Sequence, residues 1–164
     1  MKQALSIFKI GGNIIENDKE LHKFLQSYSK VTGNKILVHG GGKKATELLF
    51  KLGIEPKMVD GRRITDKATL DVVTMVYGGL VNKTIVAKLQ ALETNAIGMS
   101  GADANSIQAH KRPTTTIDYG FAGDVDGINA DLIKNILGLG TTPIFCALTH
   151  DQKGQILNLS LIHI

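Results

Sequence analysis

Two apolar segments of this chain each end in a cluster of glycines. The first covers residues 4–10 and runs into Gly11-Gly12-Asn13, and the second covers residues 35–39 and runs into Gly40-Gly41-Gly42. Both segments are short and largely apolar, which is typical of strands buried on both faces. A helical pattern of apolar residues follows each glycine cluster. This β-α-β-α order predicts an α/β fold with a mainly parallel sheet and right-handed crossovers.

The rest of the sequence departs from this alternation. Asp60-Gly61, at the centre of residues 57–64, predicts a two-residue hairpin. Thr65 is expected to cap a long helix that ends near Leu92, and Gly78-Gly79 inside it permits a bend. The other predicted elements are, in order, a strand at 95–100, short antiparallel strands at 106–111 and 120–126, a helix at 129–137, a buried strand at 142–148, and a turn at 151–154 before an extended segment at 155–158.

Glycine is more abundant than usual, at 18 of 164 residues, where an average protein has about 7%. Only three prolines accompany the glycines, and 43% of the residues are hydrophobic, so the excess indicates loops that approach a ligand closely. The net charge is +4, tryptophan is absent and aromatic residues make up 5%. Because little surface could stack on bases, we expect an anionic small molecule as ligand and no nucleic-acid partner.

The compartment is expected to be the cytoplasm. The longest apolar runs are only a few residues, which predicts no membrane span, and no signal-peptide pattern follows Met1. Cys146 is the single cysteine, so no intramolecular disulfide or zinc cluster is expected and Cys146 is interpreted as a core residue.

The glycine clusters are candidate anion sites. Ligands of open α/β sheets collect at the carboxyl ends of the strands, where glycine amides and helix N-termini favour negative charge. Lys9 lies beside the first cluster and could hold phosphate oxygens. An exposed lysine without a function is an equally good interpretation of the sequence. Arg62-Arg63 could grip a carboxylate bidentately, or could be a solvated pair.

Two established nucleotide motifs were compared with the chain. It has no G-x-x-x-x-G-K-[ST] segment, which excludes a P-loop protein. Residues 40–45 match G-x-G-x-x-A, and Asp60 follows Gly42 by 18 positions, which is a weak dinucleotide-binding signal. That signal is disfavoured because the acidic residue should end a parallel strand, and Asp60-Gly61 predicts a hairpin instead.

Four motifs occur in a characteristic order: Lys9-Ile10-Gly11-Gly12-Asn13, His39-Gly40-Gly41-Gly42, Asp60-Gly61-Arg62-Arg63-Ile64-Thr65 and Asn82-Lys83. Their order and spacing resemble the N-acetylglutamate kinases, a family of the amino-acid kinase superfamily. Residues 98–103, 120–127 and 151–158 are also similar, so the resemblance extends to about Leu159. It implies the acylglutamate-binding half of a three-layer α/β/α fold, with a mainly parallel sheet and an antiparallel hairpin as lid.

The resemblance also implies a reaction. Members of the family use ATP with Mg²⁺ to phosphorylate the side-chain carboxylate of an N-acylglutamate, a step of arginine biosynthesis, and a carboxylate needs no general base for this. Lys9 matches the lysine that stabilises the transition state. Phosphate-binding positions match Gly11, Gly12 and Gly40, and acylglutamate-binding positions match Gly41, Gly42, Arg63 and Asn158. Residues 65–92 match the segment through which the family forms homodimers, and no metal ligand is implied within the chain.

The resemblance stops abruptly after Leu159. The family continues with x-N-A-D, whose aspartate would fall at Ile162, and then with a nucleotide-binding half that holds a second catalytic lysine. We therefore expect a domain at residues 1–159 and an aberrant tail at 160–164. The codons GCT-GAT-ACA-T would encode Ala-Asp-Thr, as in the family's motif. Read one base later, they become CTG-ATA-CAT and encode Leu-Ile-His, the residues at 161–163. This suggests a frameshift, which sequencing the gene would test. A chain truncated there is expected to bind acylglutamate and dimerise without turning over ATP.

The sequence leaves several other functions open. They are a non-catalytic acylglutamate-binding module, a sister kinase that acts on aspartate, glutamate or carbamate, and the disfavoured Rossmann-type dehydrogenase. The identity of the acyl group is also left open.

Overall fold

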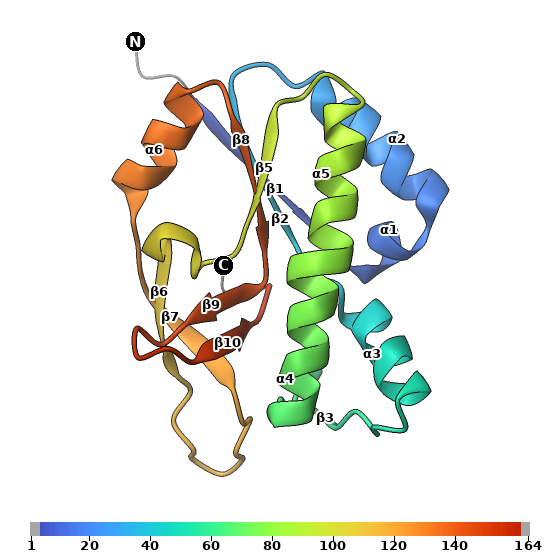
Figure 1. Ribbon diagram of the computed structural model, residues 1–164, viewed down its shortest axis with the longest axis vertical. Helices are drawn as coiled ribbons and strands as arrows, with labels where there is room; N and C mark the ends of the chain where they lie inside the picture. The colour runs from blue at the N-terminus through green and yellow to red at the C-terminus, as the bar shows by residue number, and fades with distance from the viewer. Residues whose placement is uncertain (1–3, 162–164) are drawn as a thin grey trace.

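The computed structural model describes residues 4–161 (Figure 1). Its centre is a four-stranded sheet in the order β1-β2-β8-β5, in which all neighbouring strands are parallel. The strands are β1 (Leu5–Ile10), β2 (Asn34–His39), β8 (Thr142–Cys146) and β5 (Ala96–Met99). The predicted parallel sheet and its two leading strands are therefore confirmed.

Helices cover both faces of this sheet (Figure 1). On one face lie α1 (Gly12–Glu16), α2 (Asp18–Ser29), α3 (Gly42–Lys51) and a long helix at 67–90, and on the other lies α6 (Ala130–Gly138). Asparagine side chains cap two of these helices. The Asn17 side chain accepts hydrogen bonds from two amides at the start of α2, and the Asn129 side chain accepts one at the start of α6. The three-layer α/β/α arrangement is the predicted one.

The long helix contains an unexpected π-helical segment. It consists of α4 (Lys67–Thr74), the π-helical η1 (Met75–Val81) and α5 (Asn82–Gln90). Its N-cap is Asp66, whose carboxylate accepts a hydrogen bond from the Thr69 amide, so the prediction that Thr65 caps it is wrong. Thr65 is fully buried instead.

By length and composition alone, the Lys67–Gln90 helix could cross a membrane. The prediction of no membrane span rested on the shortness of uninterrupted apolar runs, and Asp71, Asn82 and Lys83 interrupt the apolar residues of this helix. In the structure, 44% of its apolar window is buried inside the protein, and a core helix packed on a sheet passes the same test.

A small closed barrel lies beside the sheet. Its strands run in the order β10-β7-β6-β9 and are β6 (Ile107–Lys111), β7 (Ala122–Ile128), β9 (Leu148–His150) and β10 (Ile156–Leu159). The predicted antiparallel pair at 106–111 and 120–126 is confirmed as β6 and β7. The predicted strand at 142–148 is divided, because β8 ends at Cys146 in the parallel sheet and β9 belongs to the barrel.

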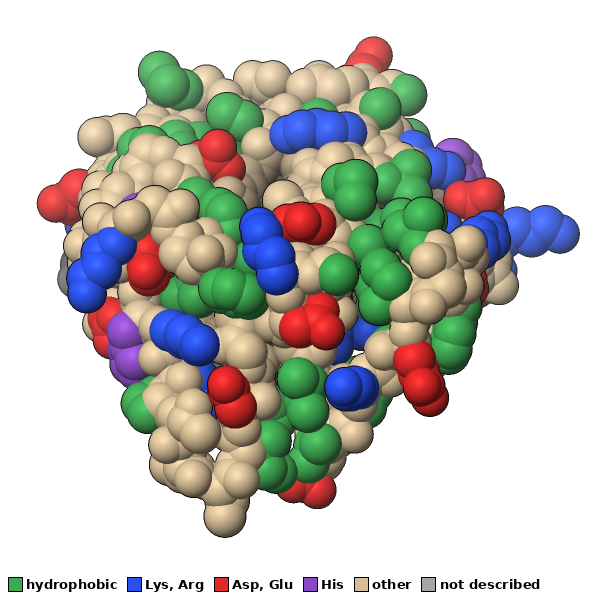
Figure 2. All heavy atoms as spheres, turned by 60° about the horizontal axis from the view of Figure 1, so that its bottom comes forward, with side chains coloured by type: hydrophobic (Ala, Val, Ile, Leu, Met, Phe, Trp, Pro, Cys, Tyr) green, Lys and Arg blue, Asp and Glu red, His purple; other side chains and the backbone are tan. Residues whose placement is uncertain are grey.

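The predicted hairpin is present as β3 (Met58–Val59) and β4 (Arg62–Arg63). Asp60 and Gly61 both have positive φ angles, 49° and 73°, as a tight two-residue hairpin turn requires. Met58, 52% exposed, lies near the exposed Phe50 and Leu52 in sequence. Figure 2 shows this end of the molecule, where hydrophobic side chains lie among charged ones of both signs.

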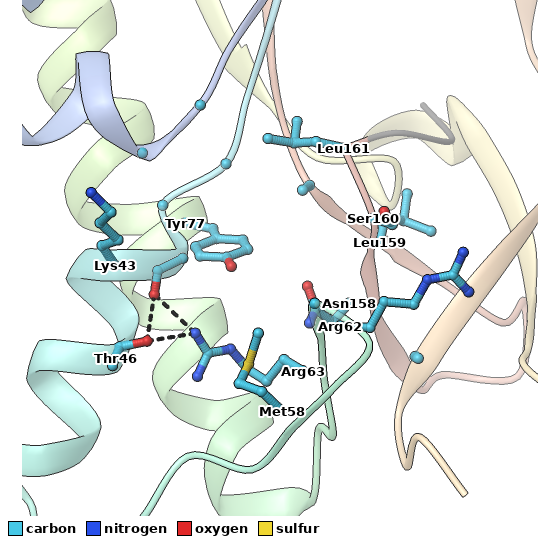
Figure 3. Close-up of a pocket in the computed structure, with 18 of the residues that line it drawn as sticks. Lys43, Thr46, Met58, Arg62, Arg63, Tyr77, Asn158, Leu159, Ser160 and Leu161 are labelled. Atoms are coloured by element: carbon cyan, nitrogen blue, oxygen red, sulfur yellow. Dashed lines mark hydrogen bonds between the residues drawn. The ribbon is translucent and has the colours of Figure 1, made fainter. Parts of the chain in front are cut away.

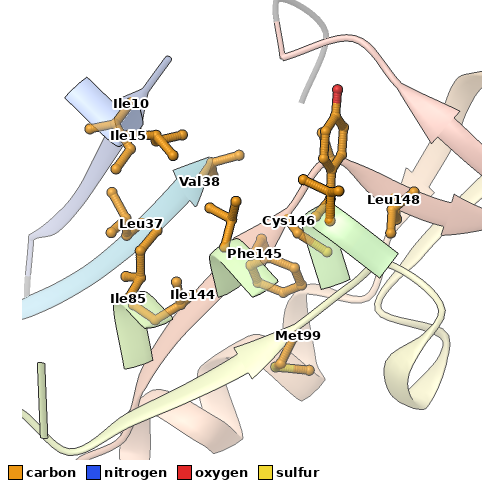
Figure 4. Close-up of a cluster of buried hydrophobic side chains, with 14 of the residues drawn as sticks. Ile10, Ile15, Leu37, Val38, Ile85, Met99, Ile144, Phe145, Cys146 and Leu148 are labelled. Atoms are coloured by element: carbon orange, nitrogen blue, oxygen red, sulfur yellow. The ribbon is translucent and has the colours of Figure 1, made fainter. Parts of the chain in front are cut away.

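The core lies between the sheet and the long helix. Leu37 and Ile144, from neighbouring strands, face Ile85 of α5, and all three side chains are fully buried (Figure 4). The prediction that β1 is buried on both faces is wrong, because β1 is an edge strand and Ile7 is 65% exposed. Only the face of β1 that carries Ile10 packs into this core.

Candidate functional site

A cleft of about 760 Å³ opens at the carboxyl ends of β1 and β2 (Figure 3). Its walls come from both glycine loops, the β3–β4 hairpin, η1 and the end of β10. All the predicted phosphate- and acylglutamate-binding residues line it: Gly11, Gly12, Gly40, Gly41, Gly42, Arg63 and Asn158. The structure therefore brings together residues that are up to 147 positions apart, counted from Gly11 to Asn158.

The second glycine loop leaves backbone amides open to this cleft. Gly41 precedes α3, and no side chain caps that helix, so its first amides can bind an anion. A Cβ at Gly41 would lie 2.9 Å from Cδ1 of Tyr77, and one at Gly40 would lie 2.7 Å from Cδ1 of Leu161. A larger residue at Gly41 would therefore collide with the Tyr77 ring, whereas at Gly40 the flexible end of the Leu161 side chain would have to move.

Arg63 extends from β4 across the N-terminus of α3. Its Nη2 donates hydrogen bonds to the carbonyl oxygen of Gly42, at 2.9 Å, and to Oγ1 of Thr46, at 2.8 Å. Its Nη1 is buried and has no hydrogen-bond partner among the residues that the structure describes. A buried guanidinium nitrogen with unused donors is costly unless a ligand accepts from it. One side of Arg63 is therefore anchored and the other is available to an anion.

Asn158 repeats this pattern from β10. Its Nδ2 donates to Oγ1 of the buried Thr65 at 3.0 Å. Its Oδ1 is buried and lacks a partner within residues 4–161. The cleft thus presents an unused cationic donor at Arg63 and an unused acceptor at Asn158. This combination suits a ligand with a carboxylate and an N–H group.

Tyr77 is a cleft residue that the sequence analysis did not select. Helical periodicity can indicate which side of the long helix is buried, but it cannot show that this side also forms a wall of the cleft. Tyr77 is 7% exposed and its ring packs against Gly41. Burial raises the pKa of its hydroxyl group, and the positive charge of the nearby Arg63 acts in the opposite direction.

A pair from the barrel forms the opposite wall. Arg112 makes an ion pair with Asp124 and lies 5.5 Å from the centre of the Tyr119 ring. Both Arg112 and Tyr119 line the cleft. The hydrogen bonds that Arg112 donates to Asp124 raise the pKa of the guanidinium further above its ordinary value. The charge of Arg112 is thus offset by Asp124. Arg63 is therefore better placed than Arg112 to bind the carboxylate of a ligand.

His39 is fully buried and packs beneath the second glycine loop, which begins at Gly40. Its Nδ1 lies 2.8 Å from the carbonyl oxygen of Gly40, and its Nε2 lies 2.9 Å from Nδ2 of Asn82. Because a carbonyl can only accept, Nδ1 carries the proton and Nε2 accepts from Asn82. Burial lowers the pKa of His39 to about 4. His39 is thus a structural residue that holds the second glycine loop in place.

The two remaining candidates at this edge differ in their surroundings. Cys146 is 1% exposed and burial raises its pKa to about 12, so the thiol is an inert core group, as predicted. Lys9 is exposed on β1 and is absent from the lining of the cleft. It points to the face opposite Ile10, since neighbouring residues of a strand alternate. Its predicted catalytic role stays a prediction.

Metal and dinucleotide sites find little support in the described residues. No group of three or more His, Cys, Asp and Glu side chains among them is arranged to hold a metal ion. Asp60 lies in a hairpin turn and not at the end of a parallel strand, so the G-x-G-x-x-A segment lacks the acidic residue that a dinucleotide site needs.

The chain belongs to the amino acid kinase family, because residues 5–161 match that family. Its curated relatives include the acetylglutamate kinases of Phocaeicola vulgatus, 55% identical over 96% of this chain, and of Cytophaga hutchinsonii, 57% identical over 95%. The chain spans 62% and 60% of the lengths of these two relatives.

Solved structures support the same fold. One is smu.665 from Streptococcus mutans, with a TM-score of 0.80 and 24% identity, which covers 97% of this chain and 64% of the other. Another is the N-acetylglutamate synthase of Neisseria gonorrhoeae, with a TM-score of 0.79 and 22% identity, which covers 96% of this chain and 37% of the other. At these identities the likeness concerns the fold alone.

Proposed function

We propose that this chain is the acylglutamate-binding part of an acetylglutamate kinase. Relatives with that name are 51–57% identical to it over 95–96% of its length. The observation that carries the proposal is the pair of unused polar atoms in the cleft, Nη1 of Arg63 and Oδ1 of Asn158. An N-acylglutamate offers a carboxylate for the first and an amide N–H for the second.

In the proposed complex, Arg63 binds the α-carboxylate and Asn158 accepts a hydrogen bond from the acylated amide nitrogen. The side-chain carboxylate of the substrate then extends toward the glycine loops. The amides of Gly41 and Gly42 contact the substrate, and those of Gly11, Gly12 and Gly40 bind oxygens of the transferred phosphoryl group. Because the carboxylate is already ionised at neutral pH, the site needs to provide only position and positive charge.

The phosphoryl donor is proposed to be ATP with Mg²⁺, which supplies the group that the substrate carboxylate attacks. Within residues 4–161, the groups proposed to face it are the amides of Gly11, Gly12 and Gly40 and the ammonium group of Lys9. No described cluster fits a metal ion, so no step is assigned to Mg²⁺ here. Catalysis in arginine biosynthesis and a cytoplasmic location belong to the proposal for the whole protein.

The proposed oligomer is a homodimer through the long helix at residues 67–90. Two observations support this segment as an interface. Met75 is 56% exposed and Leu80 is 58% exposed, both within η1. Burying such side chains against a second copy would stabilise the pair, at about 25 cal/mol per Å² of apolar surface.

A thermal-shift panel tests the proposed ligand. We expect N-acetyl-L-glutamate to raise the unfolding temperature of the 164-residue chain in a concentration-dependent way. L-Glutamate, which lacks the acyl group, L-aspartate, carbamoyl phosphate and NADH serve as matched comparisons and should have smaller effects. A shift with NADH or carbamoyl phosphate and none with N-acetyl-L-glutamate would overturn the proposal in favour of an alternative function.

A further inference from the structure

We infer that Tyr77 is a substrate-binding residue, whose hydroxyl group donates a hydrogen bond to the same carboxylate that Arg63 binds. The inference rests on the proposed function, since it concerns the same cleft and the same class of ligand. It adds a contact that the matched glycine, arginine and asparagine positions do not include.

The first argument is the position of the tyrosine ring. Tyr77 packs so closely on Gly41 that a Cβ there would lie 2.9 Å from the ring, and its hydroxyl oxygen lies 3.7 Å from the place of a Cβ at Gly42. The hydroxyl group therefore reaches the N-terminus of α3, where the backbone amides are not capped by a side chain. Figure 3 shows it pointing into the cleft, on the side of Arg63 and Asn158.

The second argument is the hydrogen-bonding capacity of the two side chains. The guanidinium of Arg63 can only donate, and it is close enough to Tyr77 for its positive charge to lower the pKa of the phenol against the effect of burial. Within residues 4–161, the Tyr77 hydroxyl group lines the cleft and donates to no acceptor. Nη1 of Arg63 is unused as well. Two neighbouring donors without acceptors match the two oxygens of one carboxylate.

The third argument is the charge state of the phenol. Burial raises the pKa of Tyr77 above its ordinary value of 10. The hydroxyl group is therefore protonated at neutral pH, as a donor must be, and does not repel an incoming carboxylate.

The fourth argument is the local backbone. Tyr77 lies in the π-helical segment Met75–Val81, and π-helical turns inside α-helices occur frequently at functional sites. Tyr77 and Val81, four positions apart within this segment, both pack against Gly41.

Calorimetric titration of the 164-residue chain with N-acetyl-L-glutamate tests the inference. Tyr77→Phe retains the ring that packs on Gly41 and removes only the donor. We expect the dissociation constant to rise about 10- to 100-fold, because a hydrogen bond to a charged group contributes about 1.5–3 kcal/mol. The matched control is Tyr28→Phe, since Tyr28 is buried outside the cleft and its hydroxyl has no partner among the described residues. That control should keep the original affinity.

A substrate analogue separates a direct contact from a structural effect. When the α-carboxylate of N-acetylglutamate is replaced by a carboxamide, the unaltered chain should bind weakly, and Tyr77→Phe should weaken binding further by much less than tenfold. An equal loss with both ligands would show that Tyr77 acts through the shape of the cleft, and would overturn the inference.

A second readout needs no loss of affinity. The chain has three tyrosines and no tryptophan, so its ultraviolet emission reports on tyrosine alone. N-Acetyl-L-glutamate should change the emission of the unaltered chain, and the change should be smaller in Tyr77→Phe at saturating ligand. If the unaltered chain binds and Tyr77→Phe behaves identically in titration and emission, the inference fails and the proposed function stands. If the unaltered chain does not bind at all, both fail.

Discussion

The buried imidazole of His39 makes the stability of this protein depend on pH between about 4 and 6.5. Burial lowers its pKa from 6.5 to about 4, because the charged form would lie without solvent between Gly40 and Asn82. Unfolding restores the ordinary pKa, so the unfolded chain binds more protons between these two values. The stabilisation is complete above pH 6.5 and is lost as the pH falls toward 4.

The size of the effect follows from the two pKa values. A difference from 6.5 to about 4 corresponds to about 3 kcal/mol, at about 1.4 kcal/mol for each pH unit. About 2 kcal/mol of it should already be lost at pH 5. The aspartates whose pKa is lowered, such as Asp66, add losses of the same sign, but at lower pH, because their ordinary value is 3.8.

Urea unfolding at intervals from pH 7.5 to pH 4.5 measures this, with His39→Gln as the reference. Glutamine can donate and accept hydrogen bonds but cannot titrate. We expect His39→Gln to be less stable at pH 7.5 and to lose stability more slowly on acidification, so that the two curves converge by about 2 kcal/mol at pH 5. Parallel curves would refute the assignment of His39 as a buried neutral imidazole.

Three further predictions concern the scaffold and the reaction. Gly120→Ala should cost at least about 2 kcal/mol of unfolding free energy in urea, because φ is +66° and a Cβ would lie 2.2 Å from the Thr65 carbonyl oxygen; Gly138→Ala, in open space on α6, should be neutral or stabilise by about 0.5–1 kcal/mol, and an equal loss in both would contradict the steric argument. Lys35→Met should cost about 2 kcal/mol, since the Lys35 ammonium donates to three carbonyl oxygens at the end of α2, whereas the exposed Lys30→Met should have little effect; equal stabilities would exclude this capping role. In the whole enzyme, Lys9→Ala should lower kcat at least about 100-fold in a steady-state kinase assay, and an unchanged kcat would remove Lys9 from the catalytic residues.

The local pattern of the sequence was sufficient for the sheet and the glycine loops. Each of the two leading strands is a compact apolar run with a glycine cluster behind it, and the Asp60-Gly61 turn needs only its own two residues to form. Arg63 and Asn158 were found through the resemblance, and the structure places both in one cleft. Their unused atoms could not be predicted, because these depend on the anchoring bonds to Thr46 and Thr65.

The errors arise where burial depends on distant neighbours. Ile7 has the composition of a buried strand residue, but β1 is at the edge of the sheet and nothing in the described residues covers that face of it. The segment 142–148 is continuous in hydropathy, yet Ala147 is where the chain leaves the sheet for the barrel. Tyr77 shows the same limit, since helical periodicity reports that a side chain is buried and not which neighbour buries it.

Binding of N-acetyl-L-glutamate at Arg63 is the central claim, and calorimetric titration of the 164-residue chain and of Arg63→Ala tests it most directly. Lys44→Ala is the matched control, because it removes a cation from α3 outside the cleft lining. We predict one ligand per chain for the unaltered protein and for the control, and an affinity at least about 100-fold lower for Arg63→Ala. Equal affinity in Arg63→Ala, with its fold confirmed by circular dichroism, would contradict the account.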